Sequence, residues 1–209
     1  TYLIQTFIFN IFYLFPMKAV ILCAGKGERL RPLTNNIPKP MIPIDNKPIL
    51  EYLILLCRKH GIKEIFISTS YLSEVIKGYF GDGSKWGVKI VYSIENEEKL
   101  PGTSGVLNNF REFLDGTFFV IYGDNLTNLN LSKMLDVHRS KKAMGTIFVY
   151  REPLTDAKST PAIVAVKSDS EIFDLIERPK ESDKERLEKI KPDEKYMNSG
   201  IYVLEPEIL

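Results

Sequence analysis

A basic, glycine-rich segment at residues 24–31, with the sequence AGKGERLR, combines residue types that bind phosphate. Glycine lets the main chain approach a ligand closely, and the side chains of Lys26, Arg29 and Arg31 offset the negative charge of a polyphosphate. Lys39 follows, among prolines at positions 32, 38, 40 and 43 that are expected to hold the basic residues on an extended path. The pattern predicts a phosphate-binding loop, and a solvated surface turn is the alternative.

The glycine spacing separates this segment from two common nucleotide-binding motifs. A P-loop has Lys and then Ser or Thr directly after its second glycine, whereas Glu28 and Arg29 stand there in this chain. A dinucleotide fingerprint has a third glycine where this chain has Leu30. A nucleotide-binding oxidoreductase therefore stays only as a distant alternative.

Two further apolar segments lead into corners that could bind a ligand. The apolar segment 88–93 precedes Glu98 and a Gly-Thr-Ser-Gly turn at 102–105, and 117–122 precedes Gly123 and Asp124. Ligands of open α/β sheets bind at the carboxyl ends of the strands, so these corners are expected near the basic loop. Asp124 is predicted to hold Mg²⁺, a cation that prefers oxygen ligands, and a turn-forming aspartate is the alternative.

Strand-like and helix-like patterns alternate along the chain and predict an α/β fold. The predicted strands are 18–23, 63–69, 88–93, 117–122, 144–150, 162–166, 171–176 and 200–204. The predicted helices are 48–60, 73–80, 103–114 and 131–141, the second opened by a Ser73 cap. Near-continuous apolar strands between helices indicate a Rossmann-like, mostly parallel mixed sheet with helices on both faces. Residues 180–195 are predicted to be a solvated helix and loop.

Composition is that of a soluble enzyme and points away from nucleic acid and membranes. The chain has 209 residues and a formal net charge of +1. Residues 1–16 are apolar but lack the flanks of a signal peptide, so the native domain is expected to begin at Met17. Cys23 and Cys57 are predicted to be reduced core thiols of a cytoplasmic protein, and His60 and His138 to have surface or capping roles at helix ends.

The motifs together resemble the sugar-1-phosphate nucleotidyltransferases, the family of nucleotide-sugar pyrophosphorylases. The resemblance rests on residues 25–34 with Pro38, Lys39 and Pro40, and on shorter motifs at 102–105 (GTSG), 123–124 (GD), 177–179 (ERP) and 198–202 (NSGIY). These motifs span nearly all of residues 17–209. Enzymes of this family join an NTP to a sugar 1-phosphate, which releases pyrophosphate and an NDP-sugar.

The resemblance implies a nucleotide-diphospho-sugar transferase fold and a role for each matching residue. Residues 17–130 would be the nucleotide-binding half and residues 131–209 a sugar-binding half that is incomplete at its C-terminal end. Mg²⁺ would be the cofactor. The implied catalytic residues are Arg29, which would bind pyrophosphate, Lys39, which would bind the α-phosphate, and Asp124, which would bind the metal. The implied nucleotide-binding residues are Ala24, Gly25, Gly27, Glu28, Glu98, Gly102 and Thr103. The implied sugar-phosphate-binding residues are Glu177, Arg178 and Asn198.

The resemblance leaves the substrate and even catalysis open. The turn at 102–105 with Glu98 ahead of it is similar to mannose-1-phosphate guanylyltransferases and to related glucose-1-phosphate enzymes. Mannose 1-phosphate with GTP is therefore slightly preferred over glucose 1-phosphate with dTTP or UTP. A non-catalytic relative that binds a nucleotide sugar and regulates a partner is the alternative. A homodimer is a further expectation.

Overall fold

The structure, a computed structural model, describes residues 16–98, 102–151, 162–177 and 179–209, which divide into two compact units. One unit combines Thr1–Thr146 with Tyr202–Leu209, and the other is Ile147–Ile201. The chain therefore passes between the units twice, along strands β7 (Gly145–Tyr150) and β10 (Lys195–Leu204). The functional division predicted at residue 130 stays a prediction.

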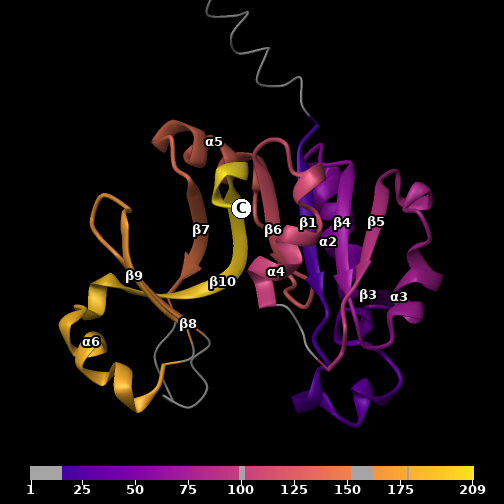
Figure 1. Cartoon of the computed structure of the whole chain (residues 1–209), viewed down its shortest axis with the longest axis horizontal. Helices are drawn as coiled ribbons and strands as arrows, with labels where there is room; N and C mark the ends of the chain where they lie inside the picture. The colour runs from indigo at the N-terminus through magenta and orange to yellow at the C-terminus, as the bar shows by residue number, and fades with distance from the viewer. Residues whose placement is uncertain (1–15, 99–101, 152–161, 178) are drawn as a thin grey trace, which may run out of the picture. The chain divides into compact units, whose positions relative to one another are not determined.

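A parallel sheet forms the centre of the first unit. Its strands are, in spatial order, β5 (Lys89–Ile94), β4 (Glu64–Thr69), β1 (Lys18–Cys23) and β6 (Phe118–Tyr122), with β10 beyond β6 (Figure 1). β1 pairs in parallel with both β4 and β6, and its first residue, Lys18, is opposite Glu64 and Phe118. Because the strands also match in length, all four end at one edge of the sheet. The segments that leave this edge begin at residues 24, 70, 95 and 123.

Both faces of this sheet are covered, as the apolar strand patterns predict. On one face, Val20 and Phe118 pack with Val106 and Phe110 of the segment that begins with helix α4 (Gly102–Asn109). Side chains alternate along a strand, so the fully buried Ile21 points to the other face, where Figure 1 shows helix α2 (Ile49–Lys59). The predicted fold class is thereby confirmed.

Two further helices and a small hairpin complete the first unit. The helices are α3 (Ser73–Phe80) and α5 (Leu131–Lys141). The hairpin pairs β2 (Pro43–Ile44) with β3 (Lys47–Pro48), and the residues between them, Asp45 and Asn46, have φ angles of 48° and 64°. Such left-handed pairs are typical of two-residue hairpin turns.

The second unit has its own antiparallel pairing and a small core. β8 (Ala162–Val166) pairs with β9 (Ile172–Glu177) on one side and with Lys195–Met197 of β10 on the other. Ala165 and Ile176 form a buried cluster with Ile190. Helix α6 (Lys184–Lys189) has no buried residue, so the prediction of a solvated helix in this region is confirmed.

Most predicted elements coincide with the observed ones. The predicted bounds of 18–23, 73–80, 131–141 and 162–166 match β1, α3, α5 and β8, and those of α2, β4, β5, β6, β7 and β9 differ by one residue at one or both ends. Two elements differ more from their predicted lengths, since helix α4 is shorter than predicted and strand β10 is longer. α4 ends at Asn109 and a separate 3-10 turn follows at Arg111–Phe113, and β10 starts at Lys195 rather than at residue 200, because Lys195–Met197 find partners on β8.

Three local predictions were wrong. Ser73 is not the cap of α3, since Leu72 occupies that position in a left-handed conformation without a side-chain cap. The proline-rich segment after the basic loop is not extended, because it folds into 3-10 turns at Leu33–Asn35 and Lys39–Met41. His138 does lie in the last turn of α5, but its side chain is buried rather than on the surface.

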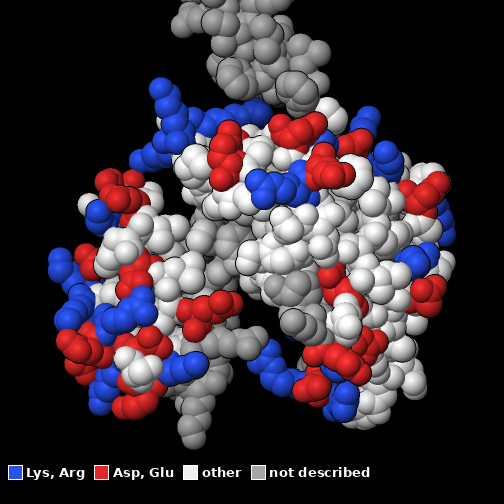
Figure 2. All heavy atoms as spheres, in the orientation of Figure 1, with Lys and Arg blue, Asp and Glu red and all other residues white. Residues whose placement is uncertain are grey.

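The described surface carries charges of both signs. Figure 2 shows basic and acidic side chains interspersed over the visible face, in keeping with a net charge of +1. None of the helices in the described ranges has the length and apolar character needed to cross a bilayer. Cys23 and Cys57 are buried and free, as predicted, and burial raises the pKa of the Cys57 thiol to about 12.

Gly123→Ala is predicted to destabilise the first unit. A Cβ atom at Gly123 would collide with Cys23 Sγ and lie 3.0 Å from the carbonyl oxygen of Leu22, so both strand ends would have to move. Overpacking of this kind typically costs about 1–3 kcal/mol of unfolding free energy. Urea unfolding is the measurement, with Gly116→Ala as the control, because nothing lies within 4 Å of the Cβ position there. Equal stability of the two variants would contradict this packing.

Candidate active site

The basic loop wraps around Gly27 at the carboxyl edge of the first unit's sheet. Gly27 has a φ angle of 65°, and its carbonyl oxygen accepts hydrogen bonds from the Leu30 amide and from the Thr34 hydroxyl, both at 2.9 Å. A Cβ atom at Gly27 would lie 3.0 Å from the Thr34 side chain and 3.2 Å from Cβ of Lys39. Glycine is therefore needed here for its left-handed backbone and for the closeness of Lys39.

Lys39 and Asp124 form an ion pair across this edge. They are 85 residues apart, yet Nζ of Lys39 donates to Oδ2 of Asp124. Asp124 follows the end of β6, where the amide of Gly123 donates to the Leu22 carbonyl oxygen at 2.9 Å. The side chains of Lys39 and Asp124 are 30% and 31% exposed, so a ligand can reach them. The structure thus brings together two of the three predicted catalytic residues.

Arg29 is exposed within the 3-10 turn Glu28–Leu30 of the same loop. Within the described part of the chain its guanidinium forms no ion pair, which leaves all its donors available for an anion. Gly25 is equally open, because nothing lies within 4 Å of its Cβ position. Ala24 and Gly25 directly follow β1, so their amides are at the strand end, as predicted.

The donor set at Asp124 fits Mg²⁺. This ion usually keeps several waters and binds one or two carboxylates together with substrate phosphates. No group of three or more acidic, His or Cys ligands exists among the described residues, so a cage made only of protein side chains is not available. Asp124 is partly exposed beside the basic loop, so it can supply the single carboxylate that such a site needs while phosphates and waters supply the other ligands.

Cys23 lies under this site but does not supply a nucleophile. Its side chain is fully buried against Gly123, and burial together with the nearby Asp124 charge raises the pKa of the thiol well above its ordinary value. A neutral buried thiol is inert.

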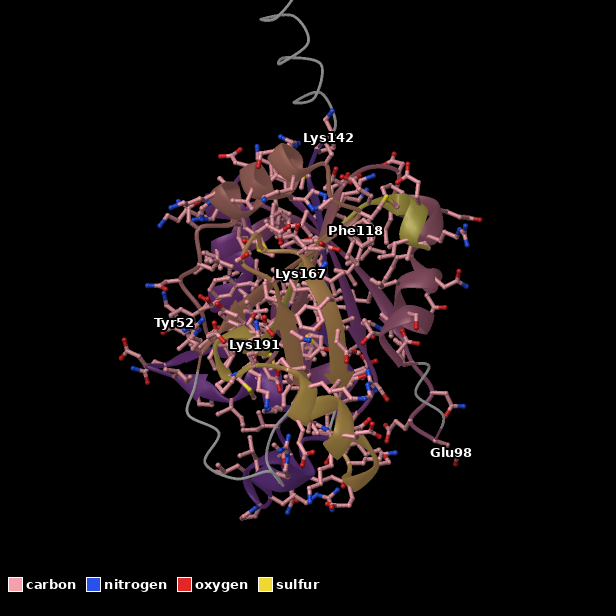
Figure 3. The ribbon with its side chains drawn as sticks, turned by 90° about the vertical axis from the view of Figure 1, so that its left-hand side faces the viewer. Tyr52, Glu98, Phe118, Lys142, Lys167 and Lys191 are labelled. Atoms are coloured by element: carbon pink, nitrogen blue, oxygen red, sulfur yellow. The ribbon has the colours of Figure 1, made fainter. Side chains whose placement is uncertain are left out.

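The residues predicted to read the base lie on a loop and in the first turn of α4. The Glu98 amide donates to the Asn96 side chain at 2.8 Å, and Figure 3 shows Glu98 at the outer tip of its loop. Gly102 and Thr103 are the exposed first residues of α4. Residues 99–101 lie outside the described ranges. Within these ranges Glu98 contacts neither the basic loop nor Asp124.

A buried carboxylate three residues earlier was missed by the sequence prediction. Glu95 is only 6% exposed, and its oxygens accept from Ser93 Oγ at 2.8 Å, Asn109 Nδ2 at 3.0 Å and Ser68 Oγ at 3.3 Å. All three donors are neutral, and no cation pairs with Glu95 in the described part of the chain. The signal available in the sequence was an acidic residue directly after the apolar strand 88–93, ahead of the more conspicuous Glu97 and Glu98.

Two buried hydroxyl groups next to Glu95 have no hydrogen-bond partner among the residues that the structure describes. They are Oγ1 of Thr69 and Oγ of Ser70, at the end of β4 between β1 and β5. The Glu95 amide donates to the Thr69 carbonyl oxygen at 2.7 Å, which ties these residues together. An unpaired buried hydroxyl costs free energy, so each of these two groups would gain from a water or a polar ligand group beside it.

The predicted sugar-side residues belong to the second unit and are described only within it. Glu177 is the exposed last residue of β9, opposite Ala162 of β8. Asn198 lies in β10, and its side-chain oxygen accepts from the Gly200 amide at 2.8 Å. Arg178 lies outside the described residues. Their roles in sugar binding stay predictions.

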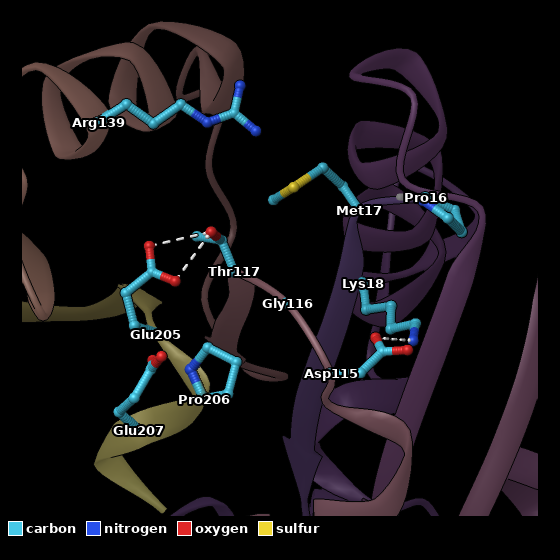
Figure 4. A pocket seen from close by; sticks show the side chains of 10 residues that line it. All are labelled: Pro16, Met17, Lys18, Asp115, Gly116, Thr117, Arg139, Glu205, Pro206 and Glu207. Atoms are coloured by element: carbon cyan, nitrogen blue, oxygen red, sulfur yellow. Dashed lines mark hydrogen bonds and ion pairs between the residues drawn. The ribbon is translucent and has the colours of Figure 1, made fainter. Parts of the chain in front are cut away.

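A cavity in the first unit lies away from this site. It has a volume of about 300 Å³ and lies at the amino ends of β1 and β6, where Figure 4 shows the Lys18–Asp115 pair and the Thr117–Glu205 hydrogen bonds. The predicted site residues do not line it. Nucleotides are therefore expected at the opposite edge, where the open loop, the ion pair and the unpaired hydroxyls lie.

Comparison with known proteins gives the relatives of this chain. The uridylyltransferase named UTP–glucose-1-phosphate uridylyltransferase of Synechocystis is 39% identical over 92% of this chain and 50% of the relative. The D-glycero-alpha-D-manno-heptose 1-phosphate guanylyltransferase of Campylobacter jejuni is 44% identical over 56% of the chain and 52% of the relative. The mannose-1-phosphate guanylyltransferase of Mycobacterium tuberculosis is 32% identical over 91% and 49%. The chain spans about half the length of these curated relatives.

Solved structures share the fold. A putative glucose-1-phosphate thymidylyltransferase from Bacillus anthracis superposes with a TM-score of 0.76 at 22% identity, covering 92% of this chain and 72% of that one. The family model described as nucleotidyl transferase matches residues 18–209, which include both units and every predicted site residue. By its sequence and by its fold, this chain belongs to the nucleotidyl transferase family, whose sugar-1-phosphate enzymes it resembles.

Proposed function

We propose that the protein transfers a nucleotidyl group from an NTP to a sugar 1-phosphate, giving an NDP-sugar and pyrophosphate. The observation that carries the proposal is the ion pair of Lys39 and Asp124 beside the glycine-rich loop, at the carboxyl edge of the sheet. A cation and a metal-binding carboxylate placed together are the requirements for holding a triphosphate. The names of the relatives describe the same type of reaction.

The reaction needs no protein nucleophile. An oxygen of the sugar phosphate attacks the α-phosphorus, and the bond from the α-phosphorus to the bridging oxygen breaks as pyrophosphate leaves. Mg²⁺ held by Asp124 and the phosphates would neutralise part of the phosphate charge. Lys39 would bind the α-phosphate, and Arg29 would bind the departing pyrophosphate. Catalysis is then alignment and stabilisation of charge by groups already in place.

We further propose guanine as the base, because of Glu95. A carboxylate accepts hydrogen bonds and cannot donate them, so it suits the adjacent N1–H and amino N–H donors of guanine. Uracil and thymine present one N–H between two carbonyl oxygens, which a carboxylate repels. Among the described residues, Oε2 of Glu95 receives a single donor, Asn109 Nδ2, so this oxygen can accept more. The unpaired Thr69 and Ser70 hydroxyls would offer polar contacts beside it.

Mannose 1-phosphate with GTP is therefore the first pair of substrates to test. Guanylyltransferases for mannose 1-phosphate and for a manno-heptose 1-phosphate are among the relatives. UTP with glucose 1-phosphate is the second candidate, because the Synechocystis relative that is 39% identical bears that activity in its name. A non-catalytic regulatory relative is less favoured, since Arg29, Lys39 and Asp124 are all present.

Lys39→Met should lower turnover by roughly 10²-fold or more, because the variant keeps the length of the side chain and loses the cation. The fold should persist, since a partly exposed ion pair contributes at most about 1 kcal/mol. Pyrophosphate release is the measurement and thermal unfolding the control. Turnover within a few-fold of the unmodified chain would contradict the role of Lys39.

Arg29→Ala should also remove most turnover, roughly 10²-fold, by loss of the pyrophosphate contact. Because Arg29 is exposed and unpaired in the described structure, stability should not change. The matched control is Arg111→Ala, which removes a guanidinium bonded to the Leu209 carbonyl oxygen away from this edge. A comparable loss of activity in both variants would argue against a specific role for Arg29.

Glu95→Gln tests the base. The amide keeps the shape and can keep the acceptor that Ser68 and Ser93 bond, but it replaces Oε2, which accepts from Asn109, with a donor. The ratio of kcat/KM for GTP over UTP should therefore fall about 10- to 200-fold. Binding of each Mg-NTP, measured by calorimetry, gives the same ratio without turnover. Glu98→Gln is the matched comparison, because it alters the base reader predicted from sequence. If the ratio fell in Glu98→Gln and not in Glu95→Gln, Glu98 rather than Glu95 would be the residue that reads the base.

A further inference from the structure

Two strands carry the chain from the first unit into the second and back. The first unit ends at Thr146, within β7, and resumes at Tyr202, within β10. β7 and β10 pair with each other. The residues at which these two strands leave the first unit are therefore the points where the chain connects the two units. We call these residues, Met144–Thr146 and Tyr202–Glu205, the strand roots.

A buried histidine connects the two strand roots. His138, in the last turn of α5, is 1% exposed. Its Nε2 is 2.9 Å from Oε1 of Glu205, and its Nδ1 is 2.8 Å from Oγ1 of Thr146. Because a carboxylate only accepts, Nε2 donates to Glu205, and in a neutral ring Nδ1 accepts from the Thr146 hydroxyl. One imidazole thus holds a residue of each root.

Glu205 is itself fixed from several sides. The Thr117 hydroxyl, one residue before β6, is 2.9 Å and 3.1 Å from the two carboxylate oxygens of Glu205. The Glu205 amide donates to the Met144 carbonyl oxygen at 3.0 Å, which joins the roots through the backbone as well. The carboxylate is 28% exposed and lines the cavity of about 300 Å³ at the amino edge (Figure 4). Water therefore reaches Glu205 while His138 stays covered.

This arrangement differs from that of an ordinary helix-end histidine. The ring of His60, at the end of α2, bonds to Ser132, the second residue of α5, and among the described residues it has no hydrogen bond to either strand root. His138 instead uses both ring nitrogens on residues that lie outside its own helix. Burial of a polar ring without loss of hydrogen bonds indicates a specific orienting role, because an apolar residue would fill the same space without the two partners.

We propose that His138 is a positioning residue that holds the roots of β7 and β10 together and so restrains the strands that carry the second unit. Its effect on catalysis rests on the proposed function, in which Glu177 and Asn198 of that unit bind the sugar phosphate. His138 touches no substrate in this scheme. Loosening the roots would weaken the sugar side of the reaction and leave the nucleotide side, built on the first unit's sheet edge, intact.

Hydrogen exchange tests the restraint without requiring activity. His138→Gln keeps a donor near the Nε2 position and loses the Thr146 contact, and Thr146→Val removes the same contact from the other side. In each variant the amides of 144–150 and 195–205 should exchange at least about tenfold faster, while those of β1 and β4 should not change. His60→Gln is the matched control and should alter neither set. Glu205→Gln, which keeps the shape and loses the charge, is a further variant that is expected to retain the fold.

Steady-state kinetics test the catalytic consequence. For the same variants the KM for the sugar 1-phosphate should rise about fivefold or more and the KM for the NTP should stay within twofold. Uniform acceleration of exchange across β1, β4, β7 and β10 would reduce His138 to a general stabilising role and overturn the proposal. Unchanged exchange at the strand roots would overturn it as well. Faster exchange at the roots in a chain that catalyses no transfer would support the restraint and contradict only the proposed function.

Discussion

The parallel, in-register pairing of β1 with β4 and β6 is the constraint on which the rest of this structure depends. The strands are five or six residues long, so their ends lie at one edge and loops that are far apart in sequence leave the sheet side by side. Gly123 allows the ends of β1 and β6 to approach closely, because a side chain at this position would collide with Cys23. Asp124, the residue that follows Gly123, forms the ion pair with Lys39.

The electrostatics of this edge suit a nucleotide in two different ways. Lys39 and Asp124 neutralise each other while remaining partly exposed. A Mg-triphosphate bound there, as proposed, would exchange one ion pair for others and would not require exposed charges to be buried. Glu95 is different, because its carboxylate is buried among neutral donors and its charge is not offset by a cation in the described structure. A ligand with N–H donors gains most at such a place.

The second unit has its own core around Ala165, Ile176 and Ile190. Arg186 of its charged helix α6 donates hydrogen bonds to Asp174 at 2.6 Å and to Asp183 at 3.3 Å. Contacts of this kind hold the unit together internally. Its link to the first unit runs through two strands, and this gives the buried His138 and its partners an importance that a histidine near a helix end would not otherwise have.

The chain's pattern by itself determined the α/β class, the bounds of most elements and the grouping of the basic loop with Asp124. Those features follow from local periodicity and from the rule that ligands bind at the carboxyl ends of parallel strands. Only the tertiary structure decided that Glu95 is buried, that Thr69 and Ser70 are unpaired, that the proline segment folds into 3-10 turns and that His138 is enclosed. Burial and hydrogen-bond partners arise from residues such as Asn109, Thr146 and Glu205 that are distant in sequence, and a local pattern carries no information about which distant side chain fills a given contact.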